Sequence, residues 1–428
     1  LIMFRNCLLD LTPLRCAFIA NKLAHYSSKT PTFSNCIPSP ILSGNQLFRI
    51  IRDKIRTSGP ITVAEYMQIC ATSQLGYYAG QNEIFGERGD FVTSPELTQI
   101  FGELIGSWVV HELEMTSWKD RWQLVELGPG SGELMADVLN VLRQFDVLQN
   151  VEVYLVESSE RLVERQRETL KKKFGEDLLR TIRWYDSLDD VPQGFSVFLA
   201  NEFLDALPVH LFARVQNNPG KWCEQYVTLD KTDEQRLCFM LSAGENIHTK
   251  AWVPQRIRGD ERRTQWEFRP QAQLIVRQMV QRFTSHGGFA LLIDYGHDGS
   301  RNDFSLRAYK GHQLVDPLQS PGEVDITADV DFGELSTAFH DECLVFGPVE
   351  QREFLGRIGF HYRLNHLLNK CKTSEERRYL LDAGRMLIDE DQMGSRFKAF
   401  GLFPSTLAEI LQMRGGTPDG FTGEGRKE

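Results

Sequence analysis

The sequence has little of what marks nucleic-acid-binding, membrane or metal-binding proteins. Its 428 residues carry no basic excess, because 58 Asp and Glu outnumber 48 Lys and Arg and give a net charge of −10, which disfavours a nucleic-acid partner. No apolar run approaches the ~20 residues that a membrane-spanning helix needs, so we expect no membrane insertion. The eight cysteines are scattered, with no C-x-x-C pair and no histidine in zinc-ligand spacing, which predicts reduced thiols and no metal site.

One pair of residues, His111 and Glu112, begins like the H-E-x-x-H helix of zinc proteases. Met115 takes the position of the second histidine, so we exclude a metalloprotease. With 41% hydrophobic and 25% charged residues, the chain has the composition of a globular protein. Its length predicts one enzyme-sized domain with additions rather than a string of modules.

The most informative stretch is WQLVELGPGSGELMADVL, residues 122–139, which predicts a strand, a glycine turn and a helix. Gly128, Gly130 and Gly132 let the chain turn with positive φ and let a ligand approach the bare backbone, while the helix N-terminus offers unpaired N–H groups. The third glycine comes one residue earlier than in the dinucleotide fingerprint, and the acidic Glu126 precedes the turn. This spacing favours a methyl-donor site similar to those of S-adenosylmethionine-dependent methyltransferases. A plain strand–helix corner is the alternative.

Two further predicted strands end in acids that suit such a donor. VEVYLVESS, residues 151–159, ends in Glu157, where a carboxylate can accept hydrogen bonds from both ribose hydroxyls. A surface acid or a helix cap is the alternative for Glu157. Asp186 lies just beyond the third short strand, where an acid could hold an adenine amino group and where a solvated loop acid is equally expected. We predict that these acids and Glu126 join the three glycines in binding the cofactor.

The fourth strand, residues 195–212, carries a polar cluster. In a doubly wound sheet ligands bind beyond the carboxyl ends of the strands, so Asn201, Glu202 and Asp205 should face the methyl group of the donor as catalytic residues. Methyl transfer from a sulfonium depends largely on holding the nucleophile near the methyl carbon. The alternative is structural, with Asn201 and Glu202 bonded to the strand end and Asp205 capping the next helix. The N-P-P-Y loop of amide and adenine methyltransferases is missing, which argues against a nucleic-acid acceptor.

Residues 1–40 differ from the rest of the chain. They carry four basic residues in the first 29 against a single acid, Asp10, with interspersed leucines, phenylalanines and serines. This composition is typical of a mitochondrial transit peptide, and Asp10 and Pro13 break any apolar core long enough for a secretory signal. A merely ragged N-terminus is the alternative.

Residues 44–116 show a mainly helical pattern, which predicts a helical N-terminal addition. Thr62, with Glu65 three residues on, predicts a helix start in the manner of a capping box. Further on, the polar loop GDFVTSPE leads into an apolar helix, with Ser94 placed to cap it. Loops of this kind often form the lid of a pocket, so Thr93 and Ser94 are candidates for cofactor binding. An ordinary N-cap is the equal alternative.

The remaining chain divides into four parts by pattern. Residues 117–208 form the first part of a core, 209–270 an antiparallel β insertion, 271–414 the rest of the core with C-terminal helices, and 415–428 a tail expected to be disordered. Asp294 and Tyr295 end an apolar strand of the second core part. They either line the acceptor side of the site or form a structural turn.

Several blocks of the sequence together resemble the MidA family. They are ELGPGSGEL, VESSERL, LANEFLDALPVH, GYYAG, GDFVTSPELTQIFGE, IDYGH, RAYKGHQLVDPL, DITADVDF and DQMGSRFK, and the similarity runs from about residue 59 to about residue 404. The family comprises mitochondrial arginine methyltransferases that assist assembly of respiratory complex I, with bacterial relatives. The resemblance implies a class I α/β methyltransferase fold, which is a Rossmann-like doubly wound sheet. It also implies S-adenosylmethionine as cofactor, the mitochondrial matrix as location, and symmetric dimethylation of an arginine in a complex I subunit. Ser131 departs from the family's loop, which often has arginine there, so we assign that side chain no role.

An arginine acceptor gives the two carboxylates after the fourth strand a task. In bidentate contact, Glu202 and Asp205 would bind the guanidinium, orient one nitrogen and localise positive charge away from that nitrogen. The leading hypothesis is therefore a protein arginine methyltransferase. A non-catalytic assembly scaffold that retains the fold is the alternative, and the glycine spacing disfavours an oxidoreductase with a nicotinamide cofactor. The oligomeric state stays open, a homodimer included.

Overall fold

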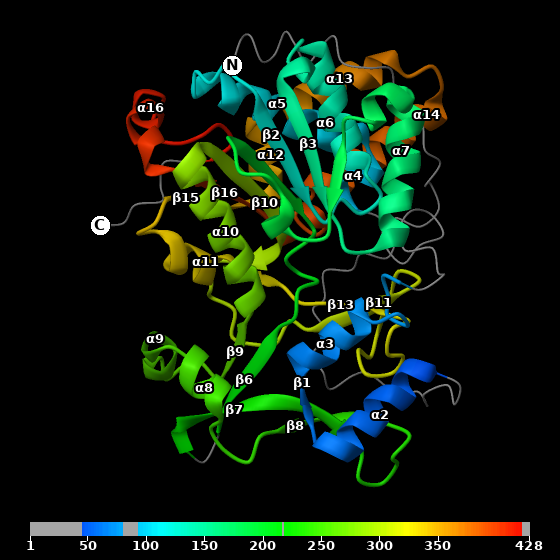
Figure 1. Ribbon diagram of the computed structural model, residues 1–428, viewed down its shortest axis with the longest axis vertical. Coiled ribbons are helices and arrows are strands. Elements are labelled where there is room, and N and C mark those ends of the chain that lie inside the picture. The colour runs from blue at the N-terminus through cyan, green and yellow to red at the C-terminus, as the bar shows by residue number, and fades with distance from the viewer. Residues whose placement is uncertain (1–44, 80–92, 216–217, 422–428) are drawn as a thin grey trace.

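Figure 1 shows the computed structural model, which describes residues 45–79, 93–215 and 218–421. The segment expected to be a transit peptide, residues 1–40, lies outside these ranges. The described chain forms a larger lobe around a central sheet, here called the core lobe, and a smaller lobe of antiparallel strands below it in the view, here called the β lobe. A search of the described helices finds none that is both long and apolar enough to cross a membrane.

The core lobe is built on an eight-stranded sheet. Its order is β15-β16-β10-β5-β2-β3-β4, with β14 paired to β10. The strands from β10 to β4 run parallel, whereas β16 is antiparallel to both of its neighbours. The chain order reverses between β2 and β5, which is the switch point where ligands bind in doubly wound sheets. The strands are β2 (Trp122–Leu127), β3 (Val151–Val156), β4 (Arg183–Tyr185), β5 (Ser196–Asn201), β10 (Gly288–His297), β14 (Val330–Asp331), β15 (Leu344–Glu350) and β16 (Phe397–Phe403).

Helices cover both faces of this sheet, because its central strands are apolar on both sides. Leu124 belongs to the cluster formed with α5, α6 and α12 to α14, whereas the next residue, Val125, packs with α10 and α11. This is the doubly wound α/β architecture that we predicted. The helices of this lobe are α4 (Ser94–Leu97), α5 (Gln99–Met115), α6 (Glu133–Gln144), α7 (Glu160–Leu179), α10 (Pro270–His286), α11 (Phe332–Phe339), α12 (Gln351–Arg357), α13 (Phe360–Lys370), α14 (Ser374–Ile388), α15 (Met393–Arg396) and α16 (Ala408–Met413).

The β lobe combines segments that are distant in the sequence. One sheet joins β1, β7, β6 and β9, with β8 on β7, and a second sheet joins β12, β11 and β13. Helices α2 and α3 pack on these strands through one apolar cluster that includes Ile51, Tyr66, Leu211 and Ile326. The elements are α2 (Gln46–Ser58), β1 (Ile61–Thr62), α3 (Val63–Thr72), β6 (His210–Val215), β7 (Asn218–Leu229), β8 (Leu237–Leu241), α8 (Ile247–Trp252), α9 (Gln255–Gly259), β9 (Gln265–Phe268), β11 (Arg307–Lys310), β12 (Gln313–Val315) and β13 (Asp325–Thr327).

The two lobes do not coincide with the segments that we expected from the sequence, because single segments contribute to both lobes. Residues 44–116 do not form one addition, because α2 and α3 pack in the β lobe while α5 is buried in the core lobe. Within residues 271–414, strands β11 to β13 likewise leave the core and complete the β lobe. The chain therefore crosses between the lobes several times, and each crossing brings a segment to the place where the lobes meet.

The end of the described chain is ordered beyond residue 415, where we expected a disordered tail. Phe421 is 5% exposed and packs against Phe354 with ring centroids 5.3 Å apart. Just before the tail, Arg414 donates to both carboxylate oxygens of the buried Glu112 at 2.7 and 2.9 Å. An aromatic anchor and a buried ion pair thus hold this segment on the core lobe.

Candidate active site

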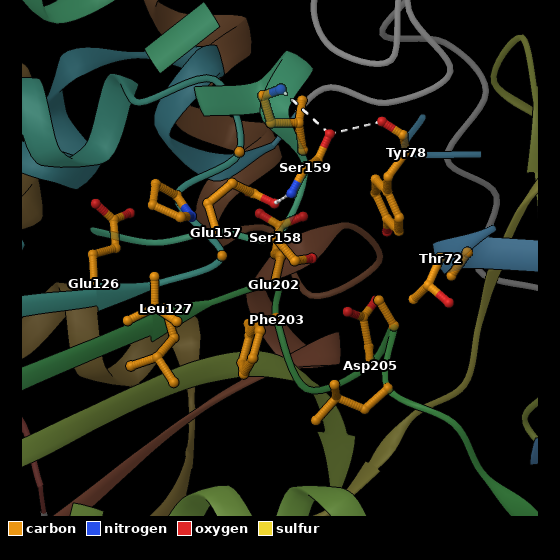
Figure 2. Close-up of a pocket in the computed structure, with 18 of the residues that line it drawn as sticks. Thr72, Tyr78, Glu126, Leu127, Glu157, Ser158, Ser159, Glu202, Phe203 and Asp205 are labelled. Atoms are coloured by element: carbon orange, nitrogen blue, oxygen red, sulfur yellow. Dashed lines mark hydrogen bonds between the residues drawn. The ribbon is translucent and has the colours of Figure 1, made fainter. Parts of the chain in front are cut away.

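A cavity of about 960 Å³ lies where the core lobe meets the β lobe, and Figure 2 shows residues that line it. The core lobe lines it with the segments that follow β2, β3, β4 and β5, and the β lobe lines it with residues after α3 and at the start of β13. The register of the sheet explains this placement. Leu127 at the end of β2 pairs with Val156 of β3 and with Ala200 of β5. The residues that follow these strands therefore reach one edge of the sheet, where the cavity opens.

The glycine turn after β2 has a backbone that glycine adopts far more readily than other residues. Gly128, Gly130 and Gly132 have φ angles of 62°, 55° and 79°, in the left-handed region. The turn is also crowded, because a Cβ on Gly128 would lie 2.6 Å from the ring of Phe203 and one on Gly132 would lie 3.2 Å from Cα of Gln166. Gly132 is the N-cap of α6. The turn and the helix N-terminus therefore offer bare backbone to a ligand in the cavity.

Glu126 stands two residues before this turn and lines the cavity. Its side chain is buried, and its Oε2 atom has no hydrogen-bond partner among the described residues. Burial raises the pKa of Glu126 to about 8. A buried carboxylate oxygen without a partner is costly, and a ligand with an ammonium group would satisfy it. The orphaned oxygen and the glycine turn thus fit S-adenosylmethionine, which carries such a group.

Glu157 follows β3 and points into the same cavity (Figure 2). Its Oε1 accepts the N–H of Ser159 at 2.9 Å, and its Oε2 accepts from Nε2 of Gln166 at 3.3 Å. Burial raises the pKa of this carboxyl group. Ser159, not Glu157, is the N-cap of α7, so the helix-capping alternative does not apply. The carboxylate of Glu157 has lone pairs left to accept hydrogen bonds from hydroxyl groups. The other predicted acid, Asp186, is exposed and also lines the cavity.

Asn201 is the last residue of β5 and Glu202 follows it directly, and both line the cavity. Glu202 has a φ of 51°, which is uncommon for a residue other than glycine. Its Oε1 accepts the N–H of Ser94 at 3.0 Å and Nδ2 of Asn201 at 3.2 Å. Burial raises the pKa of Glu202 to about 8. Oδ1 of Asn201 is buried and has no partner among the described residues, so two acceptor groups face the cavity side by side.

Asp294, in the second half of β10, explains the shape of the loop that carries these residues. Its Oδ2 accepts the backbone N–H groups of Phe203, Leu204 and Asp205 at 3.1, 2.8 and 3.2 Å. Burial raises the pKa of Asp294, while the backbone donors favour its ionised form. Of the two roles that we considered for Asp294, the structure thus supports the structural turn. The neighbouring Tyr295 lines the cavity.

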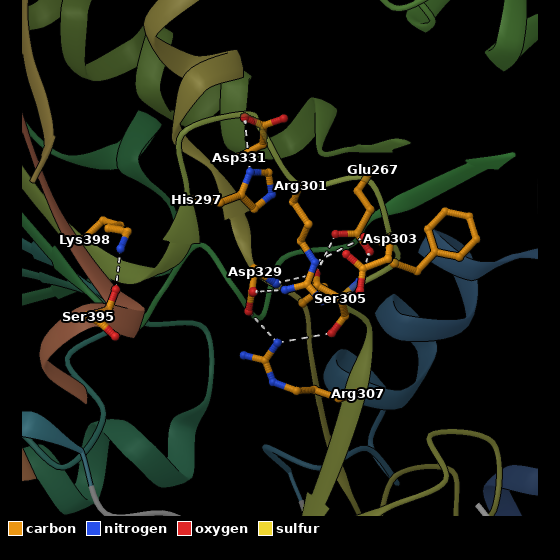
Figure 3. A network of polar contacts seen from close by, with 12 residues as sticks. Glu267, His297, Arg301, Asp303, Ser305, Arg307, Asp329, Asp331, Ser395 and Lys398 are labelled. Atoms are coloured by element: carbon orange, nitrogen blue, oxygen red, sulfur yellow. Dashed lines mark hydrogen bonds and ion pairs between the residues drawn. The ribbon is translucent and has the colours of Figure 1, made fainter. Parts of the chain in front are cut away.

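Asp205 is buried and lines the cavity. The charge of Arg307 acts on it, and Arg307 belongs to the network of polar contacts that Figure 3 shows. In this network Asp329 accepts from Arg301 at 2.6 Å and from Arg307 on β11. Burial raises the pKa of Asp205 to about 6, although the positive charges of Arg307 and Arg269 oppose the rise. Arg307 of the β lobe and Arg269, the N-cap of α10, thus partly balance the charge of this carboxyl group.

Thr93 and Ser94 lie at the start of α4, but Ser94 is not the cap that we predicted. Thr93 is the N-cap, and its N–H donates to Oε2 of Glu96 at 3.1 Å, as in a capping box. Ser94 is fully buried, and its backbone N–H is used on Glu202. Thr93 lines the cavity, whereas the lining does not include Ser94. A role for Ser94 would therefore act through the carboxylate of Glu202.

Two lining residues had no role in our sequence analysis. Tyr78 follows α3 and Asp325 begins β13, and the hydroxyl of Tyr78 donates to Oδ1 of Asp325 at 3.3 Å. Both belong to blocks that we had quoted, GYYAG and DITADVDF. The blocks lie about 250 residues apart, so no local pattern could reveal that they meet.

Two groups of side chains in the described chain could hold a metal ion by distance alone. They are His210, Glu224 and His248 in the β lobe, and His111, Glu112 and Asp419 in the core lobe. None of these six residues is part of the cavity lining. The chemistry of the cavity therefore has to be derived from its acids, amides and backbone groups.

Comparisons with known proteins agree with this geometry. A family model described as "Putative S-adenosyl-L-methionine-dependent methyltransferase" matches residues 104–349. The "Protein arginine methyltransferase NDUFAF7 homolog, mitochondrial" of Caenorhabditis elegans is 50% identical over 395 residues, which cover 88% of this chain and 91% of that protein. The "Protein arginine methyltransferase NDUFAF7, mitochondrial" of Homo sapiens is 40% identical over 376 residues, covering 84% and 83% of the two chains.

A solved structure is also similar. The crystal structure of a protein from Burkholderia thailandensis bound to S-adenosyl-homocysteine matches with a TM-score of 0.70 and 28% sequence identity, covering 83% of this chain and 91% of that chain. The likeness thus extends over most of the chain and is not confined to the glycine turn.

Proposed function

The chain belongs to the family of S-adenosyl-L-methionine-dependent methyltransferases, and from this premise we propose that it methylates arginine side chains of a protein in mitochondria. The curated relatives that share half to two fifths of its residues carry that activity and location in their names. We further propose a complex I subunit as the substrate, symmetric dimethylarginine as the product and the matrix as the compartment. These finer terms rest on the resemblance of the sequence blocks to the MidA family.

The observation that carries the proposal is the charge of the cavity. Nine acidic residues line it, against one arginine, Arg161, and no lysine or histidine among the described residues. A cavity of this charge favours cations and disfavours phosphate-rich ligands. Both the sulfonium of the methyl donor and the guanidinium of arginine are cations, and Glu202 and Asp205 lie beside the glycine turn that would hold the donor.

The cofactor is S-adenosylmethionine, and the geometry assigns residues to its parts. We propose that the glycine turn approaches its amino-acid part, that Oε2 of Glu126 accepts from its ammonium group, and that Glu157 accepts from its ribose hydroxyls. When bound, the cofactor supplies a methyl group on a positively charged sulfur and leaves as a neutral thioether. The chain's own contribution is then to bind, orient and exclude water.

Glu202, Asn201 and Asp205 would act on the arginine. The two carboxylates bind the guanidinium through charge-assisted hydrogen bonds and turn one nitrogen toward the methyl carbon. The lone pair of that nitrogen forms the new N–C bond, the electrons of the C–S bond remain on sulfur, and the nitrogen loses one proton. Glu202, which would hold the guanidinium, would accept this proton.

The raised pKa of Glu202 suits both tasks. A pKa of about 8 means that the group is largely protonated at neutral pH while no cation is nearby. An approaching guanidinium favours the ionised form, so substrate binding makes Glu202 a carboxylate. When the proton has left the nitrogen, the positive charge stays on the product, and the carboxylate can pass the proton on to solvent.

A labelling experiment tests the proposal. The protein is incubated with methyl-labelled S-adenosylmethionine and a mitochondrial extract from cells that lack it, and the labelled proteins are hydrolysed to amino acids. We expect label in methylarginine on a protein of complex I with the parent, and little with the Glu202→Gln variant. Label in another amino acid would contradict the substrate class. No label at all from a parent that binds the cofactor would favour the non-catalytic scaffold.

A further inference from the structure

A group of two histidines and one glutamate lies in the β lobe, outside the cavity. His210 is on β6, Glu224 is on β7 and His248 is on α8, and Figure 1 shows these three elements side by side. The side chain of Glu224 is fully buried, that of His210 is 11% exposed and that of His248 is 31% exposed. One ligand atom of each residue lies within 4.8 Å of the other two, so the fold brings three possible ligands to one point.

The carboxylate of Glu224 lies between the two imidazoles. Nδ1 of His210 is 2.6 Å from its Oε1, and Nδ1 of His248 is 2.8 Å from its Oε2. An ionised carboxylate can only accept, so without a metal ion both nitrogens carry a proton and donate it. A cation among the three side chains would replace these two contacts by bonds to the nitrogens and the carboxylate. The ligands of a zinc ion with bonds of about 2.0–2.1 Å stand roughly 3.3 Å apart, so each nitrogen would move by only about half an ångström.

The charge of the buried Glu224 is not balanced by a lysine or an arginine. Burial opposes the ionisation of this group, but hydrogen bonds from His210, Asn246 and His248 outweigh burial and lower its pKa. Within the described chain, the ion pairs of Glu224 are with the two histidines alone. While the imidazoles are neutral, the carboxylate therefore lacks a compensating positive charge, and a buried charge of this kind is costly. A divalent cation would supply the compensation.

The other group of possible metal ligands, in the core lobe, already contains a cation. Arg414 donates to both oxygens of Glu112 at 2.7 and 2.9 Å, and it also lies 3.2 Å from Nε2 of His111 and 3.5 Å from Oδ1 of Asp419. The guanidinium thus occupies the place that a metal ion would need between these side chains. Among the described residues, the group in the β lobe has three comparable ligands and no such cation, which favours it as a metal site.

The surroundings hold the ligands of the β lobe in place, as the outer shell of a metal site does. The ring of Trp252 packs on both imidazoles, with centroids 4.5 Å away in each case. Asn246 donates through Nδ2 to Oε2 of Glu224, and its Oδ1 accepts the N–H of Thr249 as the N-cap of α8. One residue therefore orients the carboxylate and begins the helix that carries His248. The partial exposure of His248 leaves the group accessible from solvent.

We propose that His210, Glu224 and His248 bind one Zn²⁺ ion, which fastens α8 to the two strands and stabilises the β lobe. Two imidazoles and one carboxylate are a ligand set that zinc accepts, with water in the remaining position. The inference goes beyond the proposed function and does not depend on it, because none of the three residues lines the cavity. The spacing along the chain gives no signal of the site, since Glu224 lies 14 residues after His210 and 24 residues before His248.

Titration of the full chain with Zn²⁺ tests this inference, using protein without a histidine tag from which metal has been removed by a chelator. We expect one equivalent of Zn²⁺ to bind in calorimetry and the midpoint of thermal unfolding to rise with the Zn²⁺ concentration. The His248→Gln variant loses the most exposed of the three ligands and therefore disturbs the core least. Its affinity for Zn²⁺ should be roughly 100-fold lower or more, and its midpoint should no longer respond to the ion.

A control variant and a spectrum identify the place where the ion binds. His111→Gln changes the group that Arg414 occupies, and it should bind Zn²⁺ as the parent does. Co²⁺ bound to the parent in place of Zn²⁺ should show the visible absorption of a site with nitrogen and oxygen ligands. It should lack the charge-transfer band that a thiolate ligand, such as that of the buried Cys223, would add.

Each outcome decides the inference. A folded parent that binds no Zn²⁺, or a His248→Gln variant that binds it like the parent, would overturn the inference. Loss of binding in His111→Gln, or a thiolate band in the Co²⁺ spectrum, would also overturn it, because the ion would then bind elsewhere. Affinity for S-adenosylhomocysteine and methyl transfer are separate measurements, so failure of the zinc site would leave the proposed function intact.

Discussion

The two halves of the cavity are built in different ways. The half that we propose for the donor consists of Glu126 near the end of β2, the glycine turn that follows β2, and Glu157 directly after β3, so its parts are set by single strands and the turns after them. The half that we propose for the acceptor brings Glu202 of the core lobe and Tyr78 and Asp325 of the β lobe to one cavity. A local sequence pattern can therefore encode the first half, whereas only the tertiary fold creates the second. A substitution in one half should therefore leave the function of the other half unchanged.

The largest effect should come from Gly130→Val in the donor half. Gly130 has a φ of 55° and lines the cavity. A β-branched residue strains this backbone and fills the space that a ligand needs, so we expect affinity for S-adenosylhomocysteine to fall roughly 100-fold or more. Calorimetric titration measures this.

Gly175→Val is the matched control for that variant. Gly175 also has a left-handed φ, 79°, but a Cβ there would meet nothing within 4 Å, and it does not line the cavity. It should lose some stability and keep its affinity for the ligand. Equal affinities of the Gly130→Val variant and the parent would show that the turn does not hold the donor.

Glu126 should make the empty donor half less stable as the pH rises. Its pKa of about 8 lies above the ordinary glutamate value of 4.5. The stability it contributes is thus fully present below pH 4.5 and is lost as the pH rises toward 8. Glu126→Gln should remove this loss, so the free energy of unfolding of the variant relative to the parent should rise by a few kcal/mol between pH 5 and pH 8. Chemical denaturation at both pH values measures the difference. A difference that does not change with pH would contradict the assignment.

Asp294→Asn should disturb the acceptor half through its loop. The asparagine has one acceptor oxygen and turns an N–H₂ group toward backbone donors, so we expect a loss of about 2 kcal/mol in the free energy of unfolding and a slower methyl transfer. Donor affinity should change little. The exposed Asp298, whose Oδ1 accepts the N–H of Ser300, provides the control variant Asp298→Asn. If Asp294→Asn alters only donor affinity, the two halves are not organised as we describe.

The smallest effect should come from Glu157→Gln in the donor half. The amide keeps one acceptor oxygen for the ribose but loses the charge, so affinity for S-adenosylhomocysteine should fall about tenfold. Glu168→Gln on the exposed face of α7 is the control. An unchanged affinity of the Glu157→Gln variant for S-adenosylhomocysteine would contradict the proposed hydrogen bonds between Glu157 and the ribose.

The donor half could be predicted from the sequence because each of its parts is local. The positive φ angles follow from glycine at positions 128, 130 and 132, and the position of Glu157 follows from the length of one apolar strand. Asn201 and Glu202 were placed by the same argument, since parallel strands end at one edge of the sheet. The sequence did not reveal the left-handed backbone of Glu202, because that conformation depends on the support that Asp294 gives from β10.

The β lobe and the residues that it adds to the cavity, Tyr78 and Asp325, could not be predicted because they depend on long-range packing. Apolar periodicity shows that α2, α3 and α5 are helices, but not that the first two pack with β11 to β13 while α5 packs under the sheet. The prediction at Ser94 was wrong by one residue, since Thr93 and Ser94 are both good caps and the pairing of Thr93 with Glu96 decides between them. The order of residues 415–421 depends on the packing of Phe421 against Phe354, which is also a long-range contact.

The most direct test of the account is to measure two quantities on one variant, Glu202→Gln, saturated with donor. They are its dissociation constant for S-adenosylhomocysteine and its single-turnover rate of methyl transfer to the arginine substrate. If the halves act separately, the dissociation constant should match that of the parent within about twofold, while the rate should fall roughly 100-fold or more. A rate equal to that of the parent would contradict the role of Glu202, and a donor affinity that falls as far as the rate would contradict the division of the cavity.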